Sequence, residues 1–540
     1  MPTGKRASMR EGPLAALFRK TAHDVEPGAE ERTPALPVLV LAHAAIPMKK
    51  VPAERPAPEA KRSMRYTALA VDFDGTIAHD GVVPPHVLDG LARLRDTGRK
   101  LLLVTGRELE ELVSIFPDVR LFDRVVAENG ALLYRPGSGE RQPLGDPPPE
   151  ELVERLVARG VPVSVGLSIV ATVVPHETTV IEVIKELGLE RQVIFNKGAV
   201  MVLPAGINKA SGLAVALEEL ALSPRNLVAA GDGENDHALL DSAEYSVAVA
   251  NAIQTLRMKA DRVTRETHGD GVLEVIADLI ECDLARTPPR AERRTLLLGR
   301  DARGAPVALP TAGVSMVIAG PPASGKTVIV MGLVERACAM GYQFCVIDTR
   351  GHYLDFVPAV VIGTGEHAPE TLEVLTALEK PGISVVVSVA SLAAAARPRF
   401  ITDLVRRLGA LQETTGRPHW IVIDEAQHAL PARGLKDEVA VAPAENTIYV
   451  SSEASGLPSD LLAAANAIVA CGDRADDELS ALARAIEVPA PPEAPRAPRP
   501  GEALVWSRRS GEAPVLVEPA PEDRAKERER ADVGRLLRRA

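Results

Sequence analysis

Short aliphatic runs that end in acidic or glycine-rich loops recur along this chain, and helical spacing follows most of them. Strands that alternate with helices need crossover connections, and this pattern predicts an α/β fold with parallel sheets. Aromatic residues make up only 3% of the chain, so the cores must consist mainly of Val, Leu, Ile and Ala, as in sheets buried on both faces. Four runs in the first half are predicted to be buried strands: Ala68–Val71, Lys100–Val104, Arg124–Ala127 and Leu227–Ala230.

The length of 540 residues indicates about three folded units, at roughly 100–200 residues each. Residues 1–65 are rich in Pro, Ala, Arg and Glu and lack sustained periodicity, which predicts a disordered tail, with Met64 as an alternative start. The predicted order is the tail at 1–65, a first α/β domain at 66–283 with a small α/β insertion at about 145–204, a linker with paired prolines and a charge run at 284–296, a second α/β domain at 297–488, and at 489–540 a proline-dense segment, a strand pair and a charged tail. Within the insertion we expect a strand-like run at Val163–Val174, a helix at Glu177–Leu187 and a strand at Ala199–Leu203.

The net charge, the cysteines and the hydropathy indicate which partners and which cellular compartment to expect. The formal net charge of −11 repels phosphate backbones, so broad nonspecific binding of nucleic acid is not expected. The four cysteines form no CxxC pair and match no zinc spacing, which favours reduced thiols and a cytoplasmic protein. The best apolar candidate, Pro37–Ile46, is far shorter than the ~20 residues that a membrane helix needs, so we expect no membrane partner.

Two carboxylates follow the first predicted strand, in Asp72-Phe73-Asp74-Gly75-Thr76. Acids at the carboxyl end of a buried strand are costly unless a cation or a reaction uses them, and ligands of open α/β sheets bind at this edge. Further loops offer a hydroxyl and an amine for phosphoryl oxygens and acids for a divalent cation. They are Thr105-Gly106-Arg107 after the second strand, Ile207-Asn208-Lys209 at a helix start, and Gly231-Asp232-Gly233-Glu234-Asn235-Asp236 after the fourth strand.

This ordered set of motifs resembles the haloacid dehalogenase superfamily, in particular its Cof-type branch with the type IIB cap. The resemblance covers about Tyr66–Cys282, and Ala127–Ala131 and Ala260–Thr264 also look like that branch. It implies a Rossmann-like core in which the insertion at 145–204 is a cap that closes over the site and selects the substrate. The cap is short, which fits a small phosphorylated metabolite, with sugar phosphates and phosphoglycolate as examples from the family.

The resemblance assigns each motif a role in phosphoryl transfer. By position, Asp72 attacks phosphorus and forms an aspartyl-phosphate. Asp74 protonates the leaving oxygen and then activates water. Thr105, Gly106 and Lys209 hold the transferring phosphoryl group.

The resemblance also implies a Mg²⁺ ion, held by oxygen ligands. These are Asp72, the backbone carbonyl of Asp74, Asp232 and Asp236, although Asp236 could instead cap the helix that follows it. Three residues either lie near the substrate or belong to turns and the surface: Arg107, Asn129 and Asn235.

A second phosphate-binding pattern follows the strand predicted at Val314–Ala319. The run Gly320-Pro321-Pro322-Ala323-Ser324-Gly325-Lys326-Thr327 is a complete Walker A sequence in the required strand–loop–helix context. Its backbone N–H groups would cradle the phosphates of ATP, Lys326 would reach the β and γ oxygens, and Thr327 would ligate Mg²⁺.

A later apolar strand, Trp420–Ile423, ends in two acids, as in a Walker B sequence. Asp424 would orient the magnesium shell and Glu425 would polarise the attacking water; the alternative is a strand followed by a helix-capping acid. A third strand, Asn446–Val450, ends in Ser451-Ser452, where a hydroxyl could sense the γ-phosphate or simply start a loop.

The second domain resembles the HerA/FtsK group of ATPases over about Leu297–Val517. Members often form ring hexamers in which a neighbour supplies an arginine, so the resemblance implies a homo-oligomer through this domain. Little room remains for DNA-handling insertions, which puts translocation in doubt. Candidate arginines are Arg406, Arg474 and Arg484, and the supporting matches are Leu297–Pro310, Ile347–Tyr353, Asp424–His428 and Gly501–Val505.

Two functions from different classes therefore remain open. The first is a Mg²⁺-dependent phosphatase of a small phosphorylated metabolite, fused to an ATP-hydrolysing domain. The second is a DNA-associated ATPase whose phosphatase domain processes nucleotides or nucleic-acid ends, which the acidic balance and the cap disfavour. The acids of the Walker B sequence argue against a kinase and against a nucleotide-binding scaffold without turnover.

Overall fold

The computed structural model describes residues 39–40, 64–290, 293–356, 358–365, 367–430, 446–494, 496–508 and 512–520. Most of the tail predicted at 1–65, and the charged tail beyond residue 520, lie outside these described residues. All described residues belong to one compact unit that starts at Leu39.

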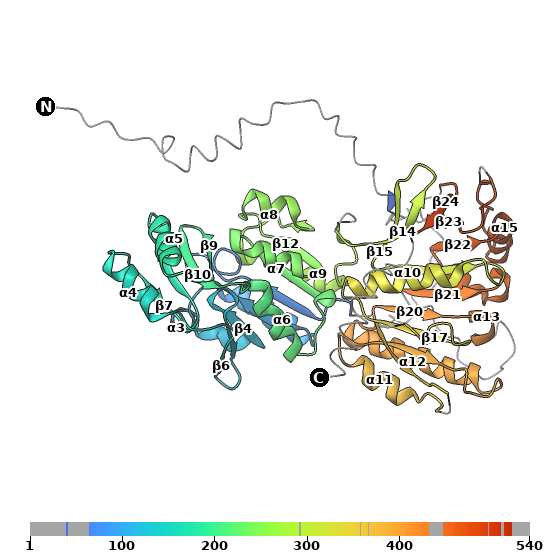
Figure 1. Ribbon diagram of the computed structural model, residues 1–540, viewed down its shortest axis with the longest axis horizontal. Helices are drawn as coiled ribbons and strands as arrows, with labels where there is room; N and C mark the ends of the chain where they lie inside the picture. Colours follow the sequence, from blue (N-terminus) through green and yellow to red (C-terminus); the bar gives the residue numbers. More distant parts are fainter. Residues whose placement is uncertain are drawn as a thin grey trace, which may run out of the picture. The chain divides into compact units, whose positions relative to one another are not determined.

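The first domain contains an eight-stranded sheet with parallel central strands, as predicted (Figure 1). The strand order is β13-β12-β11-β2-β3-β4-β5-β6, and β5 and β6 are added antiparallel at one edge. The four predicted strands are confirmed, and the last extends to Gly231. The strands are β2 Ala68–Val71, β3 Lys100–Val104, β4 Arg124–Ala127, β5 Leu132–Arg135, β6 Glu140–Pro143, β11 Leu227–Gly231, β12 Tyr245–Ala248 and β13 Arg262–Val263; the α-helices are α2 Pro85–Asp96, α3 Leu109–Ile115, α6 Lys209–Glu219, α7 His237–Ser242, α8 Gln254–Lys259 and α9 His268–Cys282.

Burial on both faces explains why the central strands are aliphatic throughout. Every residue of β2 is at most 2% exposed, so a polar side chain would lack water on either side. Val71 at the end of β2 is registered with Ala230 of β11 and with Leu103 of β3. Since these strands run in the same direction, the loops that follow them meet at one edge of the sheet.

The insertion forms a separate small α/β layer with a four-stranded sheet, β7-β8-β10-β9 (Figure 1). The run predicted as one strand at Val163–Val174 is instead two short strands, because the chain turns back at Gly166, whose N–H donates to the Ile169 carbonyl at 2.9 Å. The elements are β7 Ser164–Val165, β8 Val170–Val173, β9 Arg191–Asn196 and β10 Ala199–Pro204, with helices α4 Glu150–Ala158 and α5 Glu177–Glu186 packed against each other.

The second domain is built on a twelve-stranded sheet in the order β1-β15-β14-β24-β23-β22-β16-β21-β20-β17-β19-β18. The strands from β22 to β18 are parallel. The strand pair expected at 501–517 joins this same sheet, because β23 pairs with β22 and β24 pairs with β14. The strands are β1 Leu39–Val40, β14 Thr295–Asp301, β15 Pro306–Pro310, β16 Ser315–Ala319, β17 Phe344–Asp348, β18 Ala359–Ile362, β19 Ser384–Ser388, β20 Trp420–Ile423, β21 Thr447–Ser451, β22 Ala467–Cys471, β23 Ala503–Ser507 and β24 Val515–Pro519; the helices are α10 Lys326–Ala339, α11 Thr371–Leu378, α12 Arg397–Thr415, α13 Ala426–Ala429, α14 Ser459–Ala464 and α15 Ala475–Ala485.

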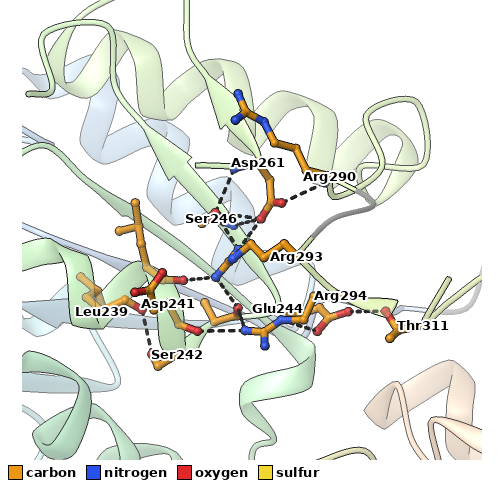
Figure 2. A network of polar contacts seen from close by, with 12 residues as sticks. Leu239, Asp241, Ser242, Glu244, Ser246, Asp261, Arg290, Arg293, Arg294 and Thr311 are labelled. Atoms are coloured by element: carbon orange, nitrogen blue, oxygen red, sulfur yellow. Dashed lines mark hydrogen bonds and ion pairs between the residues drawn. The ribbon is translucent and has the colours of Figure 1, made fainter. Parts of the chain in front are cut away.

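Arginines at the end of the segment predicted as a linker bind the first domain (Figure 2). Arg293 donates to Ser246 Oγ at 2.6 Å and pairs with the buried carboxylate of Asp261. Arg294 donates to the Ala243 carbonyl at 2.9 Å, and the buried Glu244 beside it accepts from the Thr311 hydroxyl at 3.4 Å. The end of this segment is therefore anchored to the first domain.

The predictions about a membrane segment and about the cysteines can be compared with the described residues. Among these residues, no helix combines the length and the apolar character needed to cross a membrane. The four cysteines are unbridged, and only Cys338 is not buried.

Candidate active site

Three acids from two neighbouring strands converge at the carboxyl edge of the first sheet. Asp72 follows β2, and Asp232 and Asp236 lie in the loop after β11. Carboxylate oxygens of the three residues lie within 4.8 Å of one another, and all three side chains are buried. Because β2 and β11 pair in parallel, the backbone register itself brings Asp72 and Asp232 together.

Lys209 lies among these acids at the start of α6. Its Nζ donates to Asp72 Oδ1 at 2.5 Å and to Asp236 Oδ1 at 2.6 Å, and the residue is only 1% exposed. The preceding Asn208 caps the helix by accepting from the Ser211 N–H, while Ser211 Oγ accepts from the Asn208 N–H. This cap fixes the first turn and with it the direction from which Lys209 reaches the acids.

Asp236 also organises the loop in which it lies. Its Oδ2 accepts from the backbone N–H groups of Asp232 at 2.9 Å and Gly233 at 2.8 Å. Its Oδ1 accepts from Lys209. Both oxygens are thus engaged within the protein. Asp236 is the N-cap residue of α7 but its side chain makes no capping hydrogen bond to that helix, so the contacts do not match the alternative that it caps the following helix. Its role as a Mg²⁺ ligand stays a prediction.

Two side chains to which the motifs gave no role also contact the acids. The Thr76 hydroxyl lies 3.3 Å from Asp72 Oδ2 and 3.3 Å from Asp232 Oδ1. Asn251 Nδ2 donates to the Gly75 carbonyl at 2.7 Å and lies 3.3 Å from Asp232 Oδ2. Thr76 belongs to the first acidic motif and could have been found there, whereas Asn251 follows β12 in a loop without a recognisable pattern.

Asp74 presents its backbone and its side chain to different partners. Arg107 holds the carboxylate at both oxygens, with Nε to Oδ2 and Nη2 to Oδ1 each at 2.7 Å. Arg107 also pairs with Glu111 on α3. Arg107 therefore lies beside Asp74, and its proximity to the substrate stays a prediction.

The predicted polar residues around the phosphoryl position gather close together. Thr105 is fully buried, and its hydroxyl oxygen accepts from the Arg107 N–H at 3.1 Å, which leaves the hydroxyl hydrogen free to donate to a phosphoryl oxygen. Asn235 Nδ2 donates to Asn129 Oδ1 at 2.9 Å. A Cβ on Gly106 would lie 3.4 Å from Asn235 Nδ2, so the backbone approaches this amide closely.

The electrostatics of the cluster leave an excess of negative charge. Burial and the charge of Asp236 raise the pKa of Asp72 to about 7. Burial opposes the charging of Lys209, but the charges of Asp236 and Asp72 outweigh it and raise the pKa of this lysine. Burial likewise raises the pKa of Asp232, against an opposing hydrogen bond from Lys197. Three acids thus share two ammonium groups, an imbalance that a divalent cation would correct.

The residues present fit the predicted magnesium ion. Asp72 and Asp232 offer carboxylate oxygens, and the Asp74 carbonyl is close to Asp232, because Lys197 Nζ lies 2.8 Å from that carbonyl and 2.7 Å from Asp232 Oδ2. Oxygen donors of this kind are the ligands that hard cations prefer. The arrangement can therefore hold Mg²⁺ between the loops after β2 and β11.

The cap contacts the core through a residue that was quoted in a motif without a role. Glu128, which follows β4 with a positive φ of 50°, accepts from the cap N–H groups of Leu167 at 2.9 Å and Ser168 at 2.8 Å. This pair of hydrogen bonds fixes the β7–β8 turn of the cap beside the core. Lys197 is a second cap residue at the site, and no pattern in the sequence marked it.

In the second domain, the loop predicted as Walker A connects β16 to α10. Gly320, Ala323 and Gly325 have positive φ values of 154°, 63° and 96°, so the loop folds back on itself. Lys326 Nζ donates to the carbonyls of Gly320 at 2.7 Å and Pro321 at 2.9 Å. Burial lowers the pKa of Lys326. The other predicted ATP-binding residues in the loop, Pro322, Ser324 and Thr327, are at least partly exposed.

The predicted Walker B acids follow β20, and β21 lies between β20 and β16. Asp424 is 2% exposed, and its Oδ2 has no hydrogen-bond partner among the described residues; His352 Nδ1 lies 3.5 Å from it. Burial and the charge of Asp348 raise the pKa of Asp424 to about 6. Arg350 Nε lies 3.3 Å from Glu425 Oε1. The buried Asp424 and the half-buried Glu425 thus lie close to His352 and Arg350 from the loop after β17.

The two serines after β21 have different surroundings. Ser451 Oγ donates to the Glu453 carbonyl at 2.5 Å within its own loop. Gln427 Nε2 donates both to Ser452 Oγ at 3.0 Å and to Glu425 Oε2 at 2.6 Å. Of the two candidate sensors, Ser452 is therefore the one connected to the Walker B acids.

Comparison with known proteins identifies the class of the first domain. Residues 69–156 and 171–276 match the profile of the haloacid dehalogenase-like hydrolases. A phosphoglycolate phosphatase of Natronomonas pharaonis is 33% identical over 220 residues, which are 38% of this chain and 95% of that protein. One from Methanothermobacter thermautotrophicus is 31% identical over 219 residues, which are 39% of this chain and 96% of that protein. A solved haloacid dehalogenase-like hydrolase from Bacteroides thetaiotaomicron aligns with 22% identity and a TM-score of 0.36, over 40% of this chain and 99% of that chain.

The chain therefore belongs to the haloacid dehalogenase-like hydrolase family, which confirms that part of the predicted resemblance. The relatives are matched over nearly their whole length, and the family profile ends at residue 276. The second sheet, whose strand β14 begins at Thr295, lies outside that match.

Proposed function

We propose that the first domain is a Mg²⁺-dependent phosphatase that hydrolyses small phosphate monoesters through an aspartyl-phosphate at Asp72. The observation that carries this proposal is the contact between Asp72 and Lys209 inside a cluster with Asp232. A buried carboxylate beside a lysine and a candidate cation site can attack phosphorus while the charge on the phosphoryl oxygens is neutralised.

The residues divide the reaction into two balanced steps. In the first, Asp72 attacks phosphorus, the bond from phosphorus to the leaving alcohol oxygen breaks, and Asp74 gives that oxygen a proton. In the second, Asp74 takes a proton from water, the water oxygen attacks phosphorus, and the bond to Asp72 breaks with release of inorganic phosphate. Lys209 and Thr105 donate to the phosphoryl oxygens in both steps. Mg²⁺, when bound, would neutralise charge on the nucleophile and the phosphoryl group.

Arg107 adds a condition to this mechanism. It holds both carboxylate oxygens of Asp74, the atoms that must reach the leaving oxygen and the attacking water. Substrate binding therefore has to loosen this pair before Asp74 can exchange a proton with either of them.

For the substrate we propose a small phosphorylated metabolite such as phosphoglycolate or a sugar phosphate. Two observations support this class. The relatives named above are phosphoglycolate phosphatases. In addition, the cap at about 145–204 is small and contacts the core directly at Glu128 and Lys197, which restricts the space above the acids.

The test is phosphate release from a panel of phosphate monoesters, with and without Mg²⁺, by the wild-type protein and by Asp72→Asn. We expect Mg²⁺-dependent release that falls by about a thousandfold or more in the variant. Asp89→Asn is the matched control, because Asp89 is an exposed carboxylate on α2, away from the acids. Activity that survives Asp72→Asn would refute the proposal.

We also infer that the second domain binds and hydrolyses ATP. The support is the complete Walker A loop from Gly320 to Thr327, together with the buried Asp424 and the adjacent, half-buried Glu425 at the end of β20. Lys326 would exchange its bonds to loop carbonyls for the phosphates, and Glu425 would polarise the attacking water. A homo-oligomer with an arginine from its neighbour, the cytoplasmic location and the exact domain boundaries remain predictions.

Binding of a fluorescent ATP analogue, followed by ATP hydrolysis with and without DNA, tests this second activity. We expect binding by the wild-type protein, loss of binding in Lys326→Ala, and retention in Lys380→Ala, which removes an exposed lysine outside the loop. Stimulation of hydrolysis by DNA would favour the alternative of a DNA-associated ATPase. ATP binding that persists in Lys326→Ala would contradict the assignment.

A further inference from the structure

A hairpin turn of the cap places a lysine against the acids of the core. β9 and β10 pair so that Asn196 is opposite Ala199, which leaves Lys197 and Gly198 as a two-residue turn. Both have positive φ, 48° and 86°, as a tight hairpin turn of this kind requires. A positive φ costs conformational free energy for a lysine, so the hairpin holds Lys197 in a backbone conformation that this residue type rarely adopts.

The Lys197 side chain crosses from the cap to the core. Its Nζ donates to the Asp74 carbonyl at 2.8 Å and to Asp232 Oδ2 at 2.7 Å. The lysine side chain is 43% exposed, whereas that of Asp232 is 5% exposed. Lys197 therefore lies between solvent and the buried Asp232.

Polar atoms next to this turn have no partners. Asn129 Nδ2, Asn235 Oδ1 and Asn196 Oδ1 are buried without a hydrogen bond among the described residues. They are neighbours, because Asn235 donates to Asn129 and a Cβ on Gly233 would lie 2.5 Å from Asn196 Oδ1 and 3.1 Å from Asn235 Oδ1. Buried polar atoms are almost always satisfied, so this group of unpaired atoms indicates the place of a polar ligand.

We propose that Lys197 and Asn129 form a subsite for a carboxylate on the leaving group of the substrate. This inference rests on the proposed phosphatase function, in which Lys209 and Thr105 hold the phosphoryl end. A cation bound by Asp232 and the Asp74 carbonyl would take the two oxygens that Lys197 contacts. The ammonium group then turns to the remaining anion, which is the substrate, and the Asn129 amide supplies a second donor.

The subsite selects among small phosphate monoesters by charge. A carboxylated monoester such as 2-phosphoglycolate can pair with Lys197, while 2-hydroxyethyl phosphate, in which an uncharged CH₂OH group replaces the carboxylate, leaves the ammonium unpaired. A hydrogen bond to a charged partner of this kind corresponds to a preference of about 10- to 100-fold. The cap would thus read the chemistry of the leaving group, and the core would perform the reaction.

The test compares kcat/KM for 2-phosphoglycolate and for 2-hydroxyethyl phosphate in the wild-type protein, Lys197→Met and Lys197→Arg. We expect the ratio of the two values to fall by about tenfold or more in Lys197→Met and to recover partly in Lys197→Arg. Lys185→Met is the control, because Lys185 is an exposed lysine on the cap helix α5.

A binding measurement keeps the inference testable without turnover. 2-Phosphoglycolate is titrated calorimetrically into Asp72→Asn and into the double variant Asp72→Asn with Lys197→Met. The dissociation constant of the double variant should be larger by about tenfold or more. If wild type hydrolyses no ester of the panel, the proposed function fails; if it hydrolyses sugar phosphates but not 2-phosphoglycolate, the subsite is wrong. If wild type hydrolyses both 2-phosphoglycolate and 2-hydroxyethyl phosphate and Lys197→Met leaves both the ratio and the dissociation constant within about twofold, the subsite is wrong and the phosphatase assignment stands.

Discussion

The two candidate sites both stand at the carboxyl ends of parallel strands, but they balance their buried acids differently. In the first site, Lys209 from α6 and Lys197 from the cap both bond directly to the acids. In the second, Lys326 bonds to the carbonyls of its own loop, and Asp424 Oδ2 has no hydrogen-bond partner among the described residues. The lysines of the first site thus reach the acids from distant segments, whereas the lysine of the second site bonds within its own loop.

The difference follows from how far apart the partners lie in the sequence. Lys209 is 137 residues from Asp72, so its contact exists only when the core has folded. Lys326 is 6 residues from Gly320, so its contact is available to the loop alone. Removal of a lysine should therefore have different consequences at the two sites.

The largest expected effect is that of Lys209→Met. It leaves Asp72 and Asp236 buried without their shared cation, so phosphatase activity should fall by about a thousandfold or more. The free energy of unfolding should fall by about 3–5 kcal/mol. Phosphate release and thermal unfolding measure the two effects. Lys326→Met is the matched variant, and equal losses of stability in the two proteins would contradict the comparison.

Removal of divalent cations should have the next largest effect, and it should lower both phosphatase activity and ATP hydrolysis. Chelation should lower phosphatase activity by about a hundredfold or more, and added Mg²⁺ should restore it. Mg²⁺ alone should also raise the melting temperature of the wild-type protein by more than that of Asp232→Asn, because Asp232 offers a buried ligand oxygen. Full phosphatase activity in the presence of chelator would show that the acids serve another purpose.

ATP should stabilise the protein through the second site. At about 100 times its dissociation constant, Mg-ATP should add about 2.7 kcal/mol to the free energy of unfolding. The effect should vanish in Lys326→Ala and persist in Asp72→Asn, and thermal shift measurements can follow it. Stabilisation that depends on Asp72 instead would place the nucleotide in the first site and reverse the comparison.

At the opposite ends of the strands that carry these acids, a buried histidine connects the two domains. His419 precedes β20, and its Nδ1 accepts from the Gln343 N–H at 2.8 Å. Its Nε2 lies 3.0 Å from Asn226 Oδ1, at the start of β11. With Nδ1 as an acceptor, the ring is neutral and Nε2–H donates to Asn226.

The smallest predicted effect concerns the pH dependence of stability. Burial and then the neighbouring charges of Arg417, Arg65 and Arg225 lower the pKa of His419 well below 6.5. Above pH 6.5 the His419 ring is neutral in both the folded and the unfolded state. Below pH 6.5 the ring becomes protonated in the unfolded chain but stays neutral in the folded protein. Stability should therefore fall by up to about 1.4 kcal/mol per pH unit on acidification.

His419→Gln removes this titration and provides the comparison for the pH effect. Between pH 7.5 and about 5.5, the melting temperature of the wild-type protein should fall further than that of the variant. Parallel curves for the two proteins would show that His419 takes up its proton as readily in the folded state as in the unfolded state.

The parts of the fold and site that could be predicted are those encoded by local patterns. β2, β3, β4 and β20 consist of aliphatic residues apart from the first residue of β3, β4 and β20, and their bounds match the prediction. Asp72, Asp232 and Lys209 stand directly after or at the start of such elements, so the topology alone brings them together.

The parts that could not be predicted depend on contacts between segments distant in the sequence. β9 alternates weakly and is half-buried, so its sequence lacks the apolar pattern of a strand. Lys197 is an ordinary lysine in a turn until the cap is folded over Asp232. Similarly, nothing local shows that β23 and β24 extend the second sheet, because that depends on pairing with β22 and β14.

The most direct test of the account is chemical trapping of the nucleophile. During steady-state hydrolysis of a good phosphate monoester, borohydride should reduce the acyl phosphate at residue 72 to homoserine. Peptide mass spectrometry should find this change at residue 72 only when substrate is present. Residue 74 of the same peptide should remain unmodified. Hydrolysis with no modification at residue 72, or with modification at another carboxylate, would contradict the role of Asp72.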